Sequence, residues 1–302
     1  MATTHRSDSN SGPDDMSRSR LRELNRGLRR LLGNRKAALG LLLLVPLVAG
    51  SLLGPFVVPH DPTTTNIADK NASPNSEYLL GTDHLGRDLL SRVLLGGRTS
   101  LLLGIAATAL GLVLGVPVGL FAGYSGGRVD EAIMRLMDVL MSFPSLLLAL
   151  LVLTVLSSSI WNAIMAIGVV SAPKIARVVR GSTLSVKQEE FVQAARARGE
   201  SDSYIMFGEI LPNVLPPIIV EGSIRVGFAI LVGTSLSFLG LGTQPPNPDW
   251  GYMIATARDH IWNTVWFLVW PSIALGATVV GFNLLGDGLR DVLDPEVGGE
   301  EL

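Results

Sequence analysis

The sequence contains no cysteine, and this absence excludes disulfide frameworks, cysteine-ligated zinc sites and thiol catalysis. Charge is also scarce, because Lys, Arg, Asp and Glu make up 17% of the 302 residues, against about 25% in soluble globular domains. The formal net charge of −2 gives no general affinity for nucleic acid, so no nucleic-acid partner is expected. These absences point away from an ordinary soluble protein.

Catalytic motifs are missing as well. No G-x-x-x-x-G-K-[ST] loop is present, so this chain is not expected to hydrolyse ATP. No histidine lies in an uncharged apolar window, so Ser235 has no intramembrane base. An external metal site is one alternative, although loop capping is the commoner role of such side chains. Its members are His60, Asp61, Asp83, His84 and Asp88. We expect no enzyme activity, no metal and no cofactor in this chain.

Five long windows carry no Asp, Glu, Lys, Arg or His: 37–59, 99–127, 139–173, 226–248 and 261–286. A helix needs about 20 apolar residues to cross a membrane. The third window is too long for one crossing, and it becomes two if residues 132–138 join it and Ser157–Ser159 form a hairpin. The prediction is an all-α polytopic membrane protein with spans near 37–58, 99–123, 133–156, 160–175, 214–236 and 262–285.

Lys and Arg are distributed as six spans require. With both termini in the cytoplasm, 18 of the 24 basic residues are cytoplasmic and five are external, and Arg225 lies inside a span. This bias follows the positive-inside rule and indicates a multi-pass protein of the cell (inner or plasma) membrane. The predicted organisation is a tail with an interfacial amphipathic helix (1–36), the first span (37–58), an extracytoplasmic segment (59–98), a five-helix core (99–288) and a second cytoplasmic tail (289–302).

Two features lie inside the predicted spans. Gly111, Gly115, Gly119 and Gly123 fall at intervals of four, which favours close helix packing over a ligand-lined groove. Glu221 and Arg225 lie at i and i+4 in an otherwise apolar helix. Intramembrane charges are costly and often mark a transport path, so this pair is either a contact with the translocation path or a structural pair.

The inner loop 179–213 has the pattern of a helix, a glycine and a second helix. Ser185 with Gln188 predicts a capped helix that ends at Arg198, and Gly199 suits a left-handed cap. Ser201 or Asp202 then caps a second helix, which Pro212 is expected to close. We expect this elbow to present small residues, Ala194 and Ala195, to a partner.

These residues resemble a known family. Gln193 to Ala195, Gly199 and the stretch Ile210, Leu211 and Pro212 look like the EAA loop of ABC importer permeases. Further motifs resemble the C-type permease subunit of dipeptide and oligopeptide importers, a group that includes nickel permeases. They are GTDHLGRD (81–88), MRLMD (134–138), SFP (142–144), SFLGLG (237–242) and GDGLRD (286–291). Gln193 replaces the usual Glu of the motif.

The resemblance implies a type I ABC importer permease fold and three kinds of partner besides the bilayer. These are a second, dissimilar permease subunit, two ABC ATPase subunits that bind ATP and Mg, and an extracytoplasmic substrate-binding protein. It assigns ATPase coupling to Gln193, Ala194, Ala195, Gly199, Ser201, Ile210, Leu211 and Pro212. The implied cargo is dipeptides or oligopeptides, with nickel or another small solute as the alternative. The rival classes of protein are a secondary transporter, a membrane enzyme and a channel. The external segment is expected to form a small cap that contacts the binding protein or the sister permease, and crosslinking from Asp83 or Arg87 would test this contact.

Overall fold

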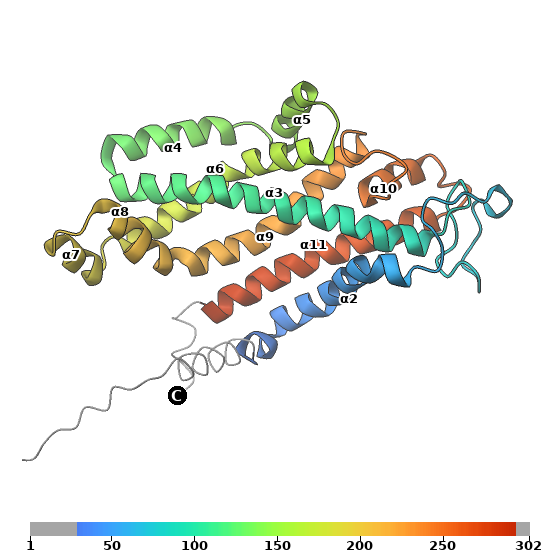
Figure 1. The fold of residues 1–302 in the computed structure, drawn as a ribbon, viewed down its shortest axis with the longest axis horizontal. Helices are drawn as coiled ribbons and strands as arrows, with labels where there is room; N and C mark the ends of the chain where they lie inside the picture. The colour runs from blue at the N-terminus through green and yellow to red at the C-terminus, as the bar shows by residue number, and fades with distance from the viewer. Residues whose placement is uncertain (1–28, 294–302) are drawn as a thin grey trace, which may run out of the picture.

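The computed structural model describes residues 29–293, and that part of the chain is an elongated bundle of helices without a β-strand (Figure 1). The predicted amphipathic helix at the N-terminus lies largely outside these residues. The elements, in order, are α2 (Arg35–Val57), η1 (Ile67–Asp69), α3 (Leu89–Ser125), α4 (Gly127–Met141), α5 (Ser145–Leu156), α6 (Ile160–Val186), α7 (Glu190–Ala197), α8 (Asp202–Tyr204), the π-helix η2 (Ile205–Ile210), α9 (Leu211–Phe238), α10 (Trp250–Arg258) and α11 (Trp266–Leu293).

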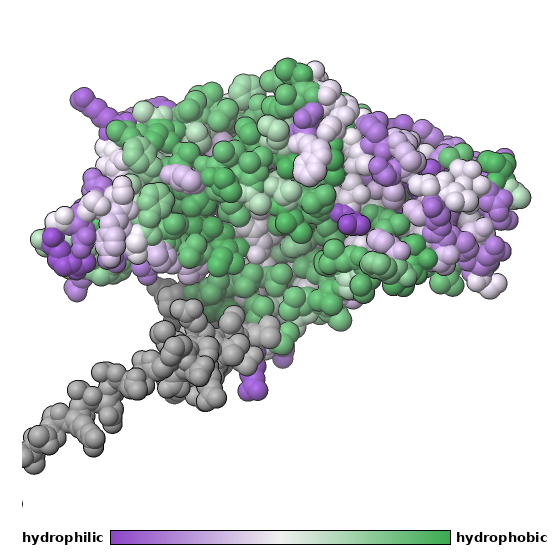
Figure 2. Space-filling model, in the orientation of Figure 1, coloured by the Kyte–Doolittle hydropathy of each residue, from purple (hydrophilic) through white to green (hydrophobic). Residues whose placement is uncertain are grey.

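Six membrane crossings are present when one bent pair of helices is counted as a single span. Five helices are long and apolar enough to cross, namely α2, α3, α6, the continuous stretch Asp202–Phe238, and α11. The sixth crossing is the pair α4 and α5, which meet at 85°. The surface between the two polar ends of the molecule is broadly apolar, as lipid contact requires (Figure 2). The predicted all-α, polytopic architecture is confirmed.

The third span differs from the expected single helix over 133–156. The chain breaks at residues 142–144, between α4 and α5. Pro144 has no backbone N–H to donate and disfavours a helical conformation in the residue before it, so the helix ends there. The predicted hairpin after α5 is present, since Ser157 has φ +74° and Ser159 caps α6 by accepting from the Trp161 N–H at 3.2 Å.

The second span begins ten residues earlier than expected, because the Asp88 carboxylate accepts from the Ser91 N–H at 2.8 Å and caps α3 at Leu89. The chain enters the described bundle at α2 and leaves it through α11 at the same end. There Lys36 Nζ lies 3.0 Å from Asp291 Oδ2. We call this end, which also carries α7, the inner end, and the opposite end the outer end.

The glycine series of α3 forms a seam against α6. A Cβ on Gly115 would lie 2.6 Å from the Ala172 carbonyl oxygen, and one on Gly119 would lie 2.3 Å from that of Ala176. A Cβ on Gly111 or Gly123 would likewise meet side-chain atoms of α6, at 3.1 and 2.8 Å respectively. The two helices therefore touch backbone to backbone, and the packing interpretation of these glycines is confirmed.

The outer segment between α2 and α3 is built around Asp83. Its carboxylate accepts from the Leu85 and Arg87 N–H groups at 2.8 and 3.0 Å and pairs with Arg87 Nε at 2.7 Å. Arg92 Nε lies 3.5 Å from the same carboxylate. Asp83 is fully buried and Arg87 is 7% exposed, so these two side chains hold the outer segment together from inside. Within residues 29–293 no three His, Asp or Glu side chains gather as metal ligands.

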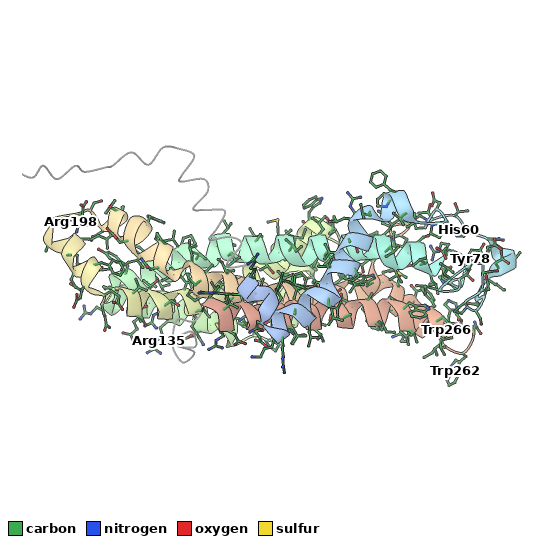
Figure 3. The ribbon with its side chains drawn as sticks, turned by 90° about the horizontal axis from the view of Figure 1, so that it is seen from below. His60, Tyr78, Arg135, Arg198, Trp262 and Trp266 are labelled. Carbon is green, nitrogen blue, oxygen red and sulfur yellow. The ribbon has the colours of Figure 1, made fainter. Side chains whose placement is uncertain are left out.

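The loop before α11 folds back into the outer end, which the sequence did not indicate. It forms α10, whose Trp250 is fully buried and donates from Nε1 to the Val93 carbonyl of α3 at 2.8 Å. Asp249 caps α10 by accepting from the Tyr252 N–H at 3.0 Å. Burial raises the pKa of Asp249, against the lowering effect of the hydrogen bond from Tyr252. Figure 3 places Trp262 and Trp266 at this outer end, opposite Arg198.

A Cβ at position 119 is expected to separate α3 from α6. Gly119→Ala would overlap the Ala176 carbonyl oxygen, and overpacking of this kind costs about 1–3 kcal/mol. The matched control is Gly181→Ala on α6, where nothing lies within 4 Å of an added Cβ. We expect thermal unfolding in detergent to show a lower melting temperature for Gly119→Ala and an unchanged or slightly higher one for Gly181→Ala. Equal melting temperatures would contradict backbone contact at the seam.

The outer end is expected to lose stability in acid. His84 stacks on His260 with ring centroids 4.5 Å apart, and burial lowers its pKa below the usual 6.5, with His260, Arg87 and Arg92 acting in the same direction and Asp83 against it. The unfolded chain then takes up the proton at higher pH than the folded chain, so stability is complete above pH 6.5 and falls as the pH drops through the folded pKa. We expect the melting temperature to fall between pH 7.5 and pH 5, and to fall less in His84→Phe, which keeps the stacking. The same fall in both proteins would rule out His84 as its source.

Candidate functional site

The inner loop between α6 and α9 is the elbow, residues 187–210, and its helices begin at other residues than expected. α6 continues through Ser185 to Val186, and α7 begins only at Glu190, so the predicted cap at Ser185 is wrong. Packing of Thr183 against Gly123 of α3 extends α6 past that local signal. α7 ends at Ala197, close to the predicted Arg198.

Gly199 makes the turn of the elbow. It has φ +78°, the left-handed region that only glycine enters without strain. Its N–H donates to the Arg196 carbonyl at 2.9 Å, and the Glu200 N–H donates to the Ala195 carbonyl at 3.2 Å, which together form a Schellman cap. Ser201 then starts α8 by accepting from the Tyr204 N–H at 3.3 Å. The predicted turn and the cap by Ser201 are both present.

The second helix of the elbow does not end at Pro212. The chain runs from α8 through the π-helix η2 into α9 without a break, and Pro212 lies in the first turn of α9. A wider π turn shifts the hydrogen-bond register, and the first turn of a helix tolerates the missing N–H of proline. The elbow is therefore a continuous extension of α9 towards the inner end.

The small residues of the elbow divide between an inward and an outward face. Ala195 is fully buried in an apolar cluster that the elbow shares with α3, α6 and α9, so the expectation that it is presented to a partner is wrong. Ile210 is also fully buried, and Leu211 packs beside it. The exposed members of the predicted coupling set are Gln193, Ala194, Gly199, Ser201 and Pro212.

Tyr124, at the inner end of α3, joins three parts of this region. Its hydroxyl donates to Asp202 of α8, and its carbonyl accepts from Lys187 Nζ at the end of α6. The cationic groups of Lys187 and Arg196 lie 5.4 and 5.3 Å from the Tyr124 ring centroid. The elbow is thus fixed to α3 and α6 by polar and cation–π contacts. Sequence reasoning missed Tyr124, since its partners are distant in sequence.

The amphipathic helix α4 is also fixed to α6. Arg180 donates to both oxygens of Asp130, at 2.5 and 2.6 Å. Arg177 pairs with Asp138, about two turns farther along α4. The bidentate geometry at Asp130 fixes direction as well as distance. At the inner end, α6 therefore holds α3 on one side, α4 on another, and the elbow at its tip.

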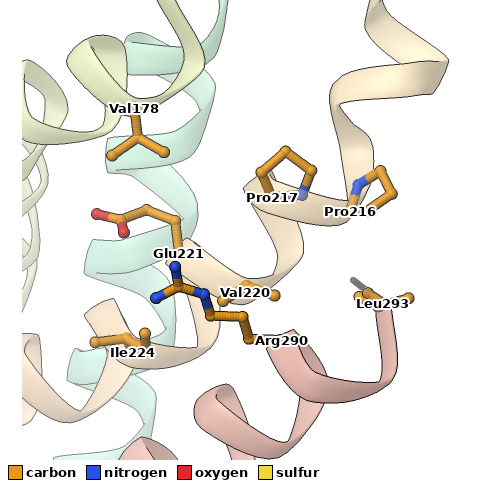
Figure 4. A pocket seen from close by; sticks show the side chains of 8 residues that line it. All are labelled: Val178, Pro216, Pro217, Val220, Glu221, Ile224, Arg290 and Leu293. Carbon is orange, nitrogen blue, oxygen red and sulfur yellow. The ribbon is translucent and has the colours of Figure 1, made fainter. Parts of the chain in front are cut away.

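Glu221 and Arg225 form an ion pair within α9, as their spacing suggests. Arg225 Nε lies 2.5 Å from Glu221 Oε1, and the side chains are 20% and 14% exposed respectively. Glu221 lines a cavity of about 450 Å³ between α6, α9 and α11 (Figure 4). Val178 of α6 and Arg290 of α11 lie on other sides of this cavity.

A third charge, Lys174 of α6, lies near this pair and was not singled out from the sequence. Its Nζ lies 2.9 Å from Ser145 Oγ, at the start of α5, and 4.8 Å from the ring centroid of Phe228 on α9. Phe228 is three residues from Arg225 on α9, so Lys174 lies beside the part of α9 that carries the Glu221–Arg225 pair. The set Lys174, Glu221 and Arg225 is called the ionic triad below.

Two family models match the chain. Residues 115–299 match the family described as "binding-protein-dependent transport system inner membrane component". Residues 24–74 match the "N-terminal TM domain of oligopeptide transport permease C". Together they cover α2, the inner part of α3 from residue 115, and the described helices that follow it.

Relatives match over nearly the full length. A dipeptide transport system permease protein of Alkalihalophilus pseudofirmus is 37% identical over 95% of both chains. A glutathione transport system permease protein of Pectobacterium atrosepticum is 42% identical over 89% of this chain and 90% of its own. A di/tripeptide transport system permease protein of Pseudomonas aeruginosa is 41% identical over 87% of this chain and 89% of its own.

A solved structure shares the fold. It is a chain of the MetNI methionine ABC transporter in an inward-facing conformation, with a TM-score of 0.56 and 19% identity over 67% of this chain and 96% of the other. The likeness shows a permease fold of the type I ABC importer kind. With the family matches and the relatives, it establishes that the chain belongs to the binding-protein-dependent transport inner membrane component family, among the C-type permeases of ABC importers.

Proposed function

We propose that this chain forms half of the translocation path of an ATP-driven importer for dipeptides or oligopeptides. The other half is a second, dissimilar permease subunit. Two ABC ATPase subunits bind ATP and Mg at the inner face, and a substrate-binding protein delivers cargo from outside. The relatives named above transport dipeptides, glutathione and di- or tripeptides, which favours peptide cargo over nickel.

The observation that carries this proposal is the elbow. It projects from the inner end of the molecule, and it is joined to α9 without a break and to α3 and α6 through Tyr124. A chain without a nucleotide-binding motif needs such a rigid projection to receive force from an ATPase. The exposed face around Gln193, Ala194 and Gly199 is the predicted contact surface. Gln193 donates to the Lys187 carbonyl at 3.2 Å, so it braces the elbow without the negative charge of a Glu.

Movement of the elbow is coupled to the spans by its attachments. When the ATPase subunits close, a push on the elbow shifts α6 and α9 together, and α4 and α3 follow through the Arg180 pair and the glycine seam. Interfaces packed this tightly shift as rigid bodies between discrete positions. The two permease subunits then exchange inward for outward access. A secondary transporter would need no such elbow, and the family membership favours the ATP-driven mechanism.

Co-expression and purification test the proposed assembly. A tag on this chain is expected to recover the second permease and the ATPase subunits. In proteoliposomes, the complex should hydrolyse ATP faster when the peptide-loaded binding protein is added. Full recovery of the complex with hydrolysis that never responds to loaded binding protein would contradict the proposed function.

Bulk at Gly199 is expected to abolish coupling. Gly199→Trp adds a large side chain at an exposed turn and forces a non-glycine residue to φ +78°, so uptake should fall at least about tenfold, the equivalent of about 1.4 kcal/mol in docking. The matched variant Gly199→Asn keeps a residue that tolerates the left-handed region and adds little bulk. It should transport within about threefold of the original chain, a cost under about 1 kcal/mol. Membrane levels of both variants serve as the insertion control, and normal uptake by Gly199→Trp would contradict the docking role.

A further inference from the structure

The ionic triad carries an excess positive charge inside the membrane. Glu221 and Arg225 neutralise each other at 2.5 Å. Lys174 contacts a hydroxyl and an aromatic face, and within residues 29–293 no carboxylate oxygen lies within 4.0 Å of its Nζ. Two cations therefore share one anion.

The depth of the triad makes this excess costly. Lys174 lies 14 residues along α6 from its outer end at Ile160, which is about 21 Å at 1.5 Å per residue. Arg225 lies 13 residues from the outer end of α9 at Phe238, or about 20 Å. Both depths fall inside a hydrocarbon core of about 30 Å. Charged groups at such depths face the protein interior or a watery cavity and mark ion or substrate pathways.

A cavity of ligand size adjoins the triad. Glu221 and Ile224 line it from α9, and Val178, one turn of α6 beyond Lys174, lines it from the other side. Its volume of about 450 Å³ falls in the range of small-molecule sites, about 300–1,000 Å³. Arg290 of α11 adds a further cation at its wall. Lys174 and Arg225 do not line the cavity, but each lies next to a residue that does: Lys174 is one turn from Val178, and Arg225 pairs with Glu221.

We propose that Lys174, backed by Arg225, is a transient binding site for the free carboxylate of a short peptide on its way through the permease. This inference rests on the proposed peptide importer and adds a residue and a chemical group to it. Ser145 holds Lys174 at the bend between α5 and α4, so the site lies where the third span changes direction. A carboxylate there completes the charge balance that the protein leaves open, and the ammonium group of the same peptide is attracted to Glu221.

Uptake measurements on the complete transporter in proteoliposomes test the site, with dialanine and dialanine amide as cargo and binding protein at saturation. Lys174→Gln should lower the maximal uptake rate of dialanine about tenfold, the expected effect of losing one charge-assisted contact. Uptake of dialanine amide should change less than about twofold, because the amide has no carboxylate to contact Lys174. Lys174→Arg should restore dialanine uptake, and Arg135→Gln, which removes an exposed cation of α4, should leave both rates unchanged.

Equilibrium binding separates this inference from the proposed function. Labelled dialanine is titrated onto the purified complex without binding protein and without ATP, and weaker binding is expected for Lys174→Gln. Lys174-dependent binding without ATP-driven uptake would overturn the proposed function and support the site.

Unchanged dialanine uptake by Lys174→Gln would overturn the site. The site would also be overturned if Lys174→Gln slowed uptake of dialanine and of its amide equally and added anionic phospholipid restored both rates. Lys174 would then hold a lipid phosphate. Lys174→Met replaces the Gln variant if the latter fails to insert.

Discussion

The backbone contact between α3 and α6 is the constraint on which the rest of the molecule depends. Lipid supplies no hydrophobic force to bring two apolar helices together, so association rests on close packing. The glycines of α3 bring its backbone against the carbonyl groups of Ala172 and Ala176. α6 is thereby fixed in position, and it is α6 that carries the α4 ion pairs, Lys174 and the beginning of the elbow.

Charged side chains are few, and those that fix the structure lie in three places. At the outer end, Asp83 binds two arginines and forms the centre of the segment between α2 and α3. At the inner end, Arg177 and Arg180 join α4 to α6, and Lys187 and Asp202 join the elbow to Tyr124. Pairing makes these sites rigid. In the ionic triad, no carboxylate oxygen of the described residues lies within 4.0 Å of Lys174 Nζ, and that imbalance suits a group through which an ionic cargo passes.

Much of this architecture follows from local patterns in the sequence. Uncharged windows predict the spans, four-residue glycine spacing predicts the seam, and Gly199 with Ser201 predicts the turn of the elbow. The 85° bend next to Pro144 did not follow from the sequence, because hydropathy records the length of an apolar segment but not its direction. The cap at Ser185 failed because packing against Gly123 carries α6 beyond it. Ala195 was assigned outwards because residue type does not reveal which face of a short helix meets the core. The contacts of Tyr124, Asp83 and Lys174 join residues far apart in the chain or buried by the fold, so only the three-dimensional arrangement reveals them.

Transmission of motion from the elbow to α4 as one rigid body is the central claim, and the absence of cysteine makes it directly measurable. Cysteines introduced at Ala197 in the elbow and Arg135 on α4, both exposed, are the only labelling sites in the chain. Pulsed electron spin resonance on the assembled transporter then gives the distance between two spin labels with and without a non-hydrolysable ATP analogue. If the elbow and α4 move as one body, the distance between positions 197 and 135 should change by less than about 2 Å, while the distance from position 197 to a label on the second permease should change by several ångströms. A change of several ångströms between 197 and 135 would show that the elbow swings by itself and would contradict the account.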